Sequence, residues 1–272
     1  MTNKPLWRRA LVHGPMIALS ALAVFPVLWM VQTSFRPENE VFSTALLPSA
    51  PTLDHYASVL DALPMARILW NTFLMAGTTA LAQVATGLLA AWALVRWRFP
   101  GGRLAQSLIA LSWLVPFQVV MIPNYVLATR LGLLDSLTGL VVPNAAAAFA
   151  VLLLYNAMRG FPREVIEAAR MDGAGNLRIL LQVVAPNLGA ALSSLGILAF
   201  ISAWNDYFWP LLLIRKVETS VVQIGLQFFM TQEGSDWGPM MAAATLASLP
   251  ILGLYLLLHR KVIDSFMRSG IR

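Results

Sequence analysis

The chain has 272 residues, of which 58% are hydrophobic and only 12% are charged, and it contains no cysteine. Soluble domains carry about a quarter charged residues, and disordered chains combine low hydrophobicity with high charge. The composition therefore excludes both classes and predicts a polytopic membrane protein. The lack of cysteine also excludes disulfide frameworks, thiolate zinc sites and iron–sulfur clusters.

Six stretches contain no Asp, Glu, Lys or Arg and are long enough to cross a bilayer, which takes about 20 apolar residues. They are Ala10–Phe35, Ile68–Val95, Leu104–Thr129, Ser136–Met158, Ile179–Asn205 and Trp237–His259. We predict an all-α fold with one transmembrane domain over residues 1–272. Its spans should cover about residues 10–33, 68–95, 104–129, 136–158, 187–209 and 238–259.

The basic residues predict the orientation, because the cytoplasmic loops of membrane proteins are enriched in Lys and Arg. If both termini are cytoplasmic, fourteen of the nineteen basic residues lie inside and five lie outside. Most acidic residues then fall outside, so the net charge of +6 reports topology and gives no reason to expect nucleic acid as a partner. A cleaved signal peptide is the alternative for the N-terminal segment, but a signal core has 7–15 residues and this run has 26.

Prolines interrupt several of the predicted spans. Pro26, Pro116, Pro123, Pro143 and Pro250 all lie well inside them. Proline removes a backbone hydrogen bond, and the freed carbonyl needs a donor from a neighbouring helix or water because lipid offers none. Tryptophans near the span ends, including Trp92, Trp97, Trp204 and Trp209, are typical of an aromatic belt at the membrane interface.

The predicted cytoplasmic loop over residues 159–186 is the most informative segment. Pro162 favours the start of a helix. Glu164 and Glu167 lie near the N-terminus of that helix, where the helix dipole is positive and favours acidic residues. Gly173 favours the end of the helix, because glycine readily adopts the left-handed backbone conformation found there. A helix over Pro162–Met171 is too short to be stable alone in water. Ala168 and Ala169 give it a side of little bulk. The helix should therefore dock either on a partner protein or on its own bundle.

The stretch Glu167-Ala168-Ala169-Arg170-Met171-Asp172-Gly173-Ala174, closed by Pro186, resembles the EAA loop of ABC-importer permeases. The Asp-Gly-Ala after Glu-Ala-Ala resembles the carbohydrate-uptake branch, in particular the maltose-type second permease. R-W-R-F-P-G-G-R (Arg96–Arg103) and W-N-D-Y-F-W-P-L-L (Trp204–Leu212) resemble other segments of that family. The similarity extends over roughly residues 10–272.

This resemblance implies a type I ABC importer permease fold in the cell inner membrane, with a coupling helix that fits a cleft on a cytoplasmic ATPase. The implied coupling residues are Glu164, Glu167, Ala168, Ala169, Arg170, Asp172, Gly173, Ala174 and Pro186. The implied partners are ABC ATPase subunits, expected as a dimer, a related second permease, an extracytoplasmic solute-binding protein and membrane lipid. The family often has Phe where this chain has Leu180, and Arg-Gln where it has Tyr155-Asn156.

The sequence contains no motif for nucleotide binding, nucleophilic catalysis or metal binding. It has no G-x-x-x-x-G-K-[ST] phosphate loop and no G-x-S-x-G elbow, and its three histidines are far apart. We expect no catalytic residue, no metal site and no cofactor bound by this chain, with ATP and Mg on the partner ATPase.

Hydrogen-bonding side chains near the spans are candidates for the solute pathway. We single out Gln118, Asn124, Tyr125, Asn144, Asn205 and Asp206. Charged residues are otherwise absent from the spans, which argues against an ion-coupled secondary transporter because such proteins use intramembrane acids or histidines. The aromatic residues at 204–209 could stack on a sugar ring or only form the belt. The extracellular loops Arg36–Arg67 and Arg215–Asp236 could meet a binding protein or only cap the bundle.

The sequence thus predicts the permease subunit of an ATP-driven, binding-protein-dependent importer that works by alternating access. The solute should be a sugar or oligosaccharide. The alternative is import of glycerol-3-phosphate or another polyol derivative, because W-N-D-Y-F-W-P-L-L also resembles permeases for that solute.

Overall fold

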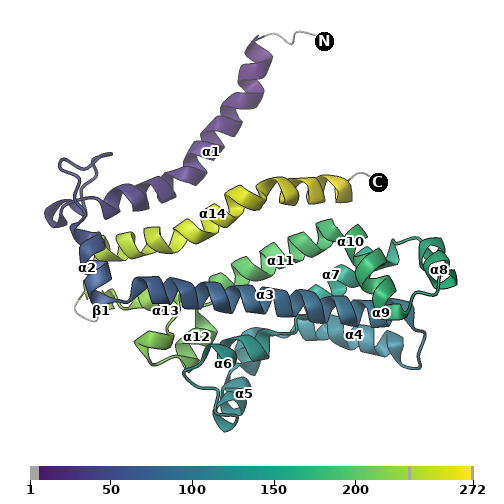
Figure 1. The fold of residues 1–272 in the computed structure, drawn as a ribbon. Coiled ribbons are helices and arrows are strands. Elements are labelled where there is room, and N and C mark those ends of the chain that lie inside the picture. Colours follow the sequence, from purple (N-terminus) through teal and green to yellow (C-terminus); the bar gives the residue numbers. More distant parts are fainter. Residues whose placement is uncertain (1–5, 232–233, 271–272) are drawn as a thin grey trace. The chain divides into compact units, whose positions relative to one another are not determined.

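The computed structural model describes residues 6–231 and 234–270, with side chains described over 13–230 and 236–257. The chain forms two compact units (Figure 1), one running through Met65 and resuming over Leu226–Pro250, the other comprising Ala66–Gly225 and continuing from Ile251. The predicted cytoplasmic ends, with Lys4 and Arg272, lie outside the described residues, as do the side chains of the other basic residues near them.

The described residues contain three unbroken helical stretches long and apolar enough to cross a membrane, His13–Ser34, Met65–Arg96 and Trp237–Leu257. Three further pairs of helices pass the same test but are bent, by 98°, 45° and 83°. With each bent pair counted as one span, the number is six, which agrees with the sequence. The predicted span boundaries stay predictions.

The first unit consists of helices, a loop over residues 41–53, and one short antiparallel hairpin in which Met230 pairs with Ser235. Its elements are α1 (Leu6–Ser34), η1 (Glu38–Glu40), α2 (Asp54–Ala62), β1 (Met230–Thr231), β2 (Gly234–Ser235) and the first part of α14 (Trp237–Gly270). Helix α2 packs closely on the start of α14, because a Cβ atom added to Gly238 would overlap the buried His55 ring.

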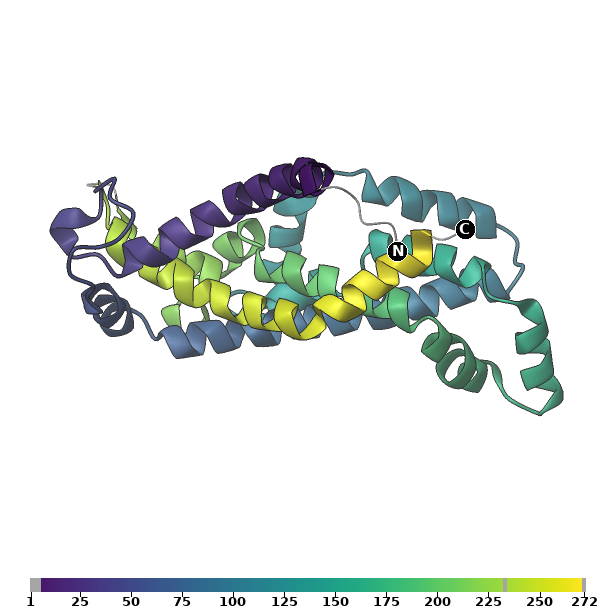
Figure 2. The same cartoon turned by 90° about the horizontal axis from the view of Figure 1, so that it is seen from above.

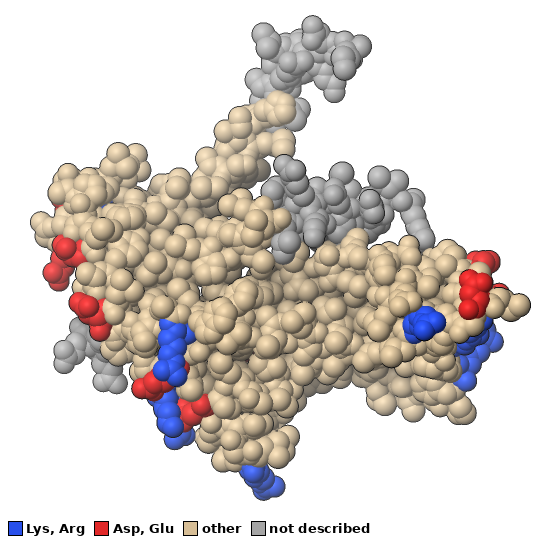
Figure 3. All heavy atoms as spheres, in the orientation of Figure 1, with Lys and Arg blue, Asp and Glu red and all other residues tan. Residues whose placement is uncertain are grey.

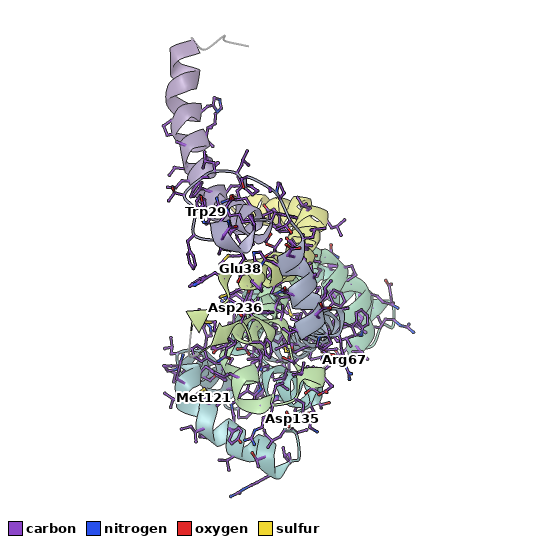
Figure 4. All side chains as sticks on the ribbon, turned by 90° about the vertical axis from the view of Figure 1, so that its left-hand side faces the viewer. Trp29, Glu38, Arg67, Met121, Asp135 and Asp236 are labelled. Carbon is purple, nitrogen blue, oxygen red and sulfur yellow. The ribbon has the colours of Figure 1, made fainter. Side chains whose placement is uncertain are left out.

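A buried arginine organises the loop that follows α1. Arg36 is fully buried, and its guanidinium donates to Gln32 Oε1 and to the carbonyl oxygens of Glu40, Ser43 and Ala45. Its Cζ atom lies 5.1 Å from the centre of the Trp29 ring, a residue labelled in Figure 4. A buried charge is tolerated only when it is hydrogen-bonded, so this set of acceptors fixes the path of the loop.

A second contact closes the same loop. The hydroxyl and the backbone N–H of Ser49 both donate to the carboxylate of Glu40. These hydrogen bonds lower the pKa of Glu40, because they favour its ionised form. The contact is therefore complete at neutral pH and weakens only when the carboxylate is protonated in acid.

The second unit holds most of the helices. Its elements are α3 (Met65–Arg96), α4 (Gly102–Trp113), α5 (Phe117–Arg130), α6 (Leu137–Val141), η2 (Val142–Asn144), α7 (Ala148–Arg159), α8 (Arg163–Met171), α9 (Asn176–Arg178), η3 (Ile179–Val184), α10 (Ala185–Asn187), α11 (Gly189–Trp204), α12 (Phe208–Leu213), η4 (Val217–Thr219), α13 (Val222–Gln227) and the remainder of α14. On the face drawn in Figure 3, charged side chains gather toward the left and right sides, with a further basic side chain at the lower tip, and the broad middle of this face carries none.

Two hydrophobic clusters form the core of this unit. One joins the C-terminal half of α3 to α7, η3 and α11 through residues such as Trp92, Leu154 and Leu180. The other joins α3, α6 and α12 through residues such as Met75, Leu140 and Trp209. Helices α3 and α7 approach closely, since a Cβ atom on Gly87 would lie 3.0 Å from Ala150 Cβ.

The break between η2 and α7 shows how freed backbone carbonyls are satisfied. Pro143 lies in η2, where the chain bends by 45°. Gln83 Nε2 of α3 donates to the Asn144 carbonyl over 2.8 Å, and Thr86 Oγ1 donates to the Ala145 carbonyl over 2.9 Å. These two carbonyls lose their helical donors at the break itself. The carbonyl that Pro143 leaves without its helical donor is that of Gly139, and Trp209 Nε1 of α12 donates to it over 3.1 Å, so the prediction that a neighbouring helix supplies the donor is confirmed.

The turn after α5 is fixed by an aspartate. Asp135, labelled in Figure 4, has a left-handed backbone with φ of 53°, which Asp tolerates better than most residues. Its carboxylate accepts hydrogen bonds from the backbone N–H groups of Arg215 and Lys216, at 2.5 and 3.2 Å. This residue therefore ties the end of α5 to the segment after α12.

Replacement of Arg36 should destabilise the first unit. Arg36→Met removes the donors that serve three loop carbonyls, and we expect a loss of about 3 kcal/mol because hydrogen bonds to a charged group contribute about 1.5–3 kcal/mol each. Thermal unfolding of the detergent-solubilised protein measures the effect. Arg67→Met, at an exposed arginine of the same predicted loop, is the control, and equal destabilisation by both variants would contradict the assigned role.

Candidate functional site

The predicted surface helix is present as α8, Arg163–Met171. It begins one residue later than predicted, because Pro162 has an extended backbone and serves as the N-cap. Figures 1 and 2 place α8 at the end of the second unit where α3 also ends. Glu164 lies in its first turn and Arg170 in its last, which complements the helix dipole.

The helix stops at Gly173 as the sequence predicted. Gly173 has φ of 81°, its N–H donates to the Arg170 carbonyl, and the Ala174 N–H donates to the Ala169 carbonyl, at 2.9 and 3.0 Å. This pair of hydrogen bonds is the Schellman motif, which satisfies the last carbonyls of a helix. The turn is therefore tightly defined, and it directs the chain back toward the bundle.

The two sides of α8 have different environments. Ile166 and Ala169 pack against the core cluster that contains Trp92 and Leu180. The opposite side, which we call the free face, is exposed and consists of Glu164, Val165, Ala168 and Met171. Met171 is 90% exposed, an unusual position for an apolar side chain. The sequence left docking on a partner and docking on the bundle as alternatives, and the helix has one face suited to each.

The segment after the turn connects α8 rigidly to the bundle. It runs through α9, the π-helical turn η3 and α10, and then bends by 83° into α11. Leu180 is fully buried, so the residue that replaces the family's Phe fills the core. Pro186 lies in the first turn of α10, just before the bend.

A second candidate site is a polar cavity of about 150 Å³ inside the second unit. It is lined by Met75, Thr79, Gln83, Leu140, Asn144, Ala199, Ser202, Ala203 and Asp206. Two of the predicted pathway residues, Asn144 and Asp206, meet there although they are far apart in sequence. A third hydrogen-bonding side chain of the predicted spans, Gln83, joins them. The structure adds Thr79 and Ser202, which the sequence gave no reason to group with them.

Asp206 is the single ionisable side chain among the residues that line this cavity. It follows the end of α11 and lies near the backbone N–H groups of Tyr207 and Trp209. Among the side chains described, no group of three His, Cys, Asp or Glu residues is placed to hold a metal ion. The arrangement can hydrogen-bond a polar solute.

The other predicted pathway residues do not line the cavity. Gln118 is exposed on α5, and Asn124 and Tyr125 are half-buried on the same helix. Tyr125 accepts a hydrogen bond from Arg215 Nη2 over 3.3 Å. Asn205 is exposed and donates to the Ile201 carbonyl over 2.9 Å. The structure therefore brings together two of the six candidates.

The tryptophans differ from a uniform interfacial belt. Trp92, Trp204 and Trp209 are buried, with 4%, 1% and 1% of their surface exposed. Trp209 Nε1 donates to the Gly139 carbonyl over 3.1 Å, and Trp204 stacks on Phe200. These rings fill the core, so they belong neither to a belt nor to a surface on which a sugar could stack. Trp97 is 46% exposed and fits the belt.

The Schellman turn gives a direct test of the local structure. Gly173→Val should destabilise the end of α8 by about 1–2 kcal/mol, because a side chain in the left-handed region is strained. Amide hydrogen exchange over residues 163–174 measures the change. Gly173→Asn should be milder since Asn tolerates this conformation, and equal protection in all three proteins would contradict the turn.

Residues 83–268 match the family described as "Binding-protein-dependent transport system inner membrane component". This match covers more than half of the chain and includes both candidate sites apart from Met75 and Thr79.

Individual proteins similar to this chain are also permeases of transport systems. The chain is 30% identical to the sn-glycerol-3-phosphate transport system permease protein UgpE of Escherichia coli O1:K1, over 98% of each chain. It is 27% identical to the arabinooligosaccharides transport system permease protein AraQ of Halalkalibacterium halodurans, over 93% of each.

Solved structures have the same fold. One chain of a bacterial ABC transporter involved in the import of the acidic polysaccharide alginate superposes with a TM-score of 0.82, at 25% identity, covering 96% of this chain and 99% of that one. A second, from the alginate transporter in complex with its pentasaccharide-bound periplasmic protein, gives 0.67 at 13% identity and supports the fold alone. The chain therefore belongs to the binding-protein-dependent transport system inner membrane components, and it is a membrane-spanning permease subunit of an ABC transporter.

Proposed function

We propose that this permease imports a sugar or oligosaccharide by alternating access, with the polar cavity of the second unit as part of the solute pathway. The observation that carries the proposal is the convergence of Gln83, Asn144 and Asp206 on one cavity inside the bundle. Amide and carboxylate groups pair well with hydroxyl groups of a neutral solute. A carbohydrate is supported by two similar proteins, an arabinooligosaccharide permease and a transporter that imports alginate.

Energy for transport comes from a partner, since the sequence has no phosphate loop. We assign the free face of α8 to the docking of an ATPase subunit, one of a dimer that holds ATP and Mg. In this assignment α8 and both termini are cytoplasmic. Met171 and Val165 offer apolar contact and Glu164 offers a negative charge, while the opposite face of α8 would transmit motion to the bundle through Ile166 and Ala169.

The proposed extracytoplasmic partner is a solute-binding protein, with a second related permease completing the pathway. The loop that Arg36 organises carries three strongly exposed apolar side chains, Phe42, Leu46 and Leu47, at 80%, 72% and 76%. Exposed apolar patches of this kind mark interaction surfaces. The loop is therefore suited to meet the binding protein.

A second candidate solute is glycerol-3-phosphate, which is favoured by the similarity to the sn-glycerol-3-phosphate permease UgpE. A phosphate group seeks Arg or Lys, yet the cavity lining contains a carboxylate and neither of these residues. In this chain a neutral solute is the better match, and a phosphorylated one would need its positive partner from the second permease.

The two solutes predict opposite responses to one substitution. For a neutral sugar, Asp206→Asn should lower uptake by about tenfold, because a hydrogen bond to a charged group is lost. For a phosphorylated solute, the same change removes a repulsion and should raise uptake. Uptake of labelled solutes by proteoliposomes that contain the complete complex measures both. Ser112→Ala is the control, as this exposed polar residue lies outside the cavity and is not a predicted pathway residue.

The coupling assignment is tested on the free face. Ala168→Trp and Glu164→Lys should each reduce binding-protein-stimulated ATP hydrolysis and uptake by at least about tenfold, because a factor of ten needs a change of only about 1.4 kcal/mol. The amount of permease in the membrane should stay unchanged. Arg178→Gln, on an exposed residue outside α8, is the control, and normal uptake by both free-face variants would remove the coupling claim.

A further inference from the structure

A second, larger cavity lies beside α8 on the side away from its free face. Its volume is about 700 Å³, and it opens between the ends of α3 and α7 and the start of α8. Five arginines line it, Arg96, Arg98, Arg159, Arg163 and Arg170, against the single acid Glu167. Such an excess of positive charge around one cavity needs a counter-charge.

Two buried donors at this cavity lack partners. Trp92 is 4% exposed, and its Nε1–H has no hydrogen-bond partner among the described residues. The buried Nε of Arg96, one turn further along α3, also has none. Both residues line the cavity. Buried donors are nearly always paired, so these two point to an acceptor that is bound there in the working protein.

The cavity wall also contains apolar surface. Leu94, Val95 and Trp97 line it together with the arginines, and Trp97 is 46% exposed. The Arg159 guanidinium lies 5.8 Å from the centre of the Tyr155 ring, an arrangement that holds the cation beside the cavity. A ligand that fits should therefore combine an anionic, acceptor-rich head with an apolar body.

We infer that this cavity binds the phosphate headgroup of an acidic phospholipid of the inner leaflet. Phosphate oxygens accept charge-assisted hydrogen bonds from arginine, and basic pockets between helices on the cytoplasmic side bind such headgroups. The apolar wall suits the start of an acyl chain. The inference goes beyond the proposed function. It shares with it the cytoplasmic placement of α8 and two lining residues, Glu167 and Arg170, that the family resemblance implies in coupling.

A carboxylate of the ATPase fits less well. One carboxylate would leave most of the five guanidinium groups without a counter-charge, and it would leave the apolar wall uncovered. The free face proposed for the ATPase also lies on the other side of the helix, with Ala168 and Met171. Bound lipid would contact α3, α7 and α8 together, so the membrane would hold the coupling helix in position.

The test uses the complete transporter, purified with its partner subunits. Native mass spectrometry measures phosphatidylglycerol retained from nanodiscs of phosphatidylglycerol mixed with phosphatidylcholine. Each basic residue near an anionic surface contributes about fivefold in affinity. The double variant Arg96→Gln, Arg159→Gln should therefore bind phosphatidylglycerol about 30-fold more weakly.

Trp92→Phe keeps an aromatic ring and removes the N–H donor, and it should weaken phosphatidylglycerol binding by about tenfold. Arg178→Gln, outside the cavity, is the matched control.

Three outcomes would overturn the inference. Equal loss with Arg178→Gln would mean general attraction to the membrane surface. Retention of phosphatidylglycerol only after removal of the ATPase would mean that the ATPase fills the cavity. Unchanged retention in both the double variant and Trp92→Phe would exclude the site.

A further arm separates the two sources of phosphate. Inorganic phosphate should not displace phosphatidylglycerol from the mixed nanodiscs, and it should not bind at the cavity when the transporter is in nanodiscs of phosphatidylcholine alone. Binding of inorganic phosphate alone, lost in the double variant, would keep the anion site and overturn its assignment to lipid. Lipid retention requires no transport, so its result is independent of the solute and of the proposed coupling.

Discussion

Backbone carbonyl groups inside a membrane protein must find their donors within the protein, and the architecture of this permease follows from that constraint. The broken pair η2 and α7 exists because Gln83 and Thr86 of α3 reach the carbonyls that the break releases. Asn71 holds the carbonyls of Glu218 and Ser220 in the same way, and Trp209 holds that of Gly139. Donors from side chains therefore allow the backbone to leave regular helix inside the bundle. The polar cavity lies beside one such irregular segment, η2.

The surface helix α8 illustrates how a short helix gains stability and function together. It is too short to persist alone in water, and its Ile166 and Ala169 side rests on the core. The Schellman turn at Gly173 ends it at a defined residue. Because the bundle fixes one side, the other side can present Glu164, Val165, Ala168 and Met171 at constant positions. A partner that binds there therefore binds a preorganised surface.

Local signals were predictable from the sequence, and long-range groupings were not. Gly173, the start of α8 near Pro162 and the need for donors at Pro143 all follow from short-range chemistry. Asn144 and Asp206 meet through the packing of α3, η2 and α11, which periodicity does not encode, and Thr79 and Ser202 carry no distinguishing sequence signal. Trp204 and Trp209 looked interfacial by position, yet both are buried. Trp209 packs in the cluster with Met75 and Leu140, and Trp204 stacks on Phe200, which are contacts that position along the chain does not reveal.

The neutral surroundings of Arg36 affect how the loop after α1 responds to salt. Every hydrogen-bond acceptor around its guanidinium is neutral, being an amide oxygen of Gln32 or a backbone carbonyl. Dissolved salt screens exposed charge pairs strongly, whereas a buried cation held by dipoles is little affected. The loop should therefore keep its shape over a wide range of ionic strength. In the proposed orientation this loop lies outside the cytoplasm, where it would keep its contact surface as the salt concentration around the cell changes.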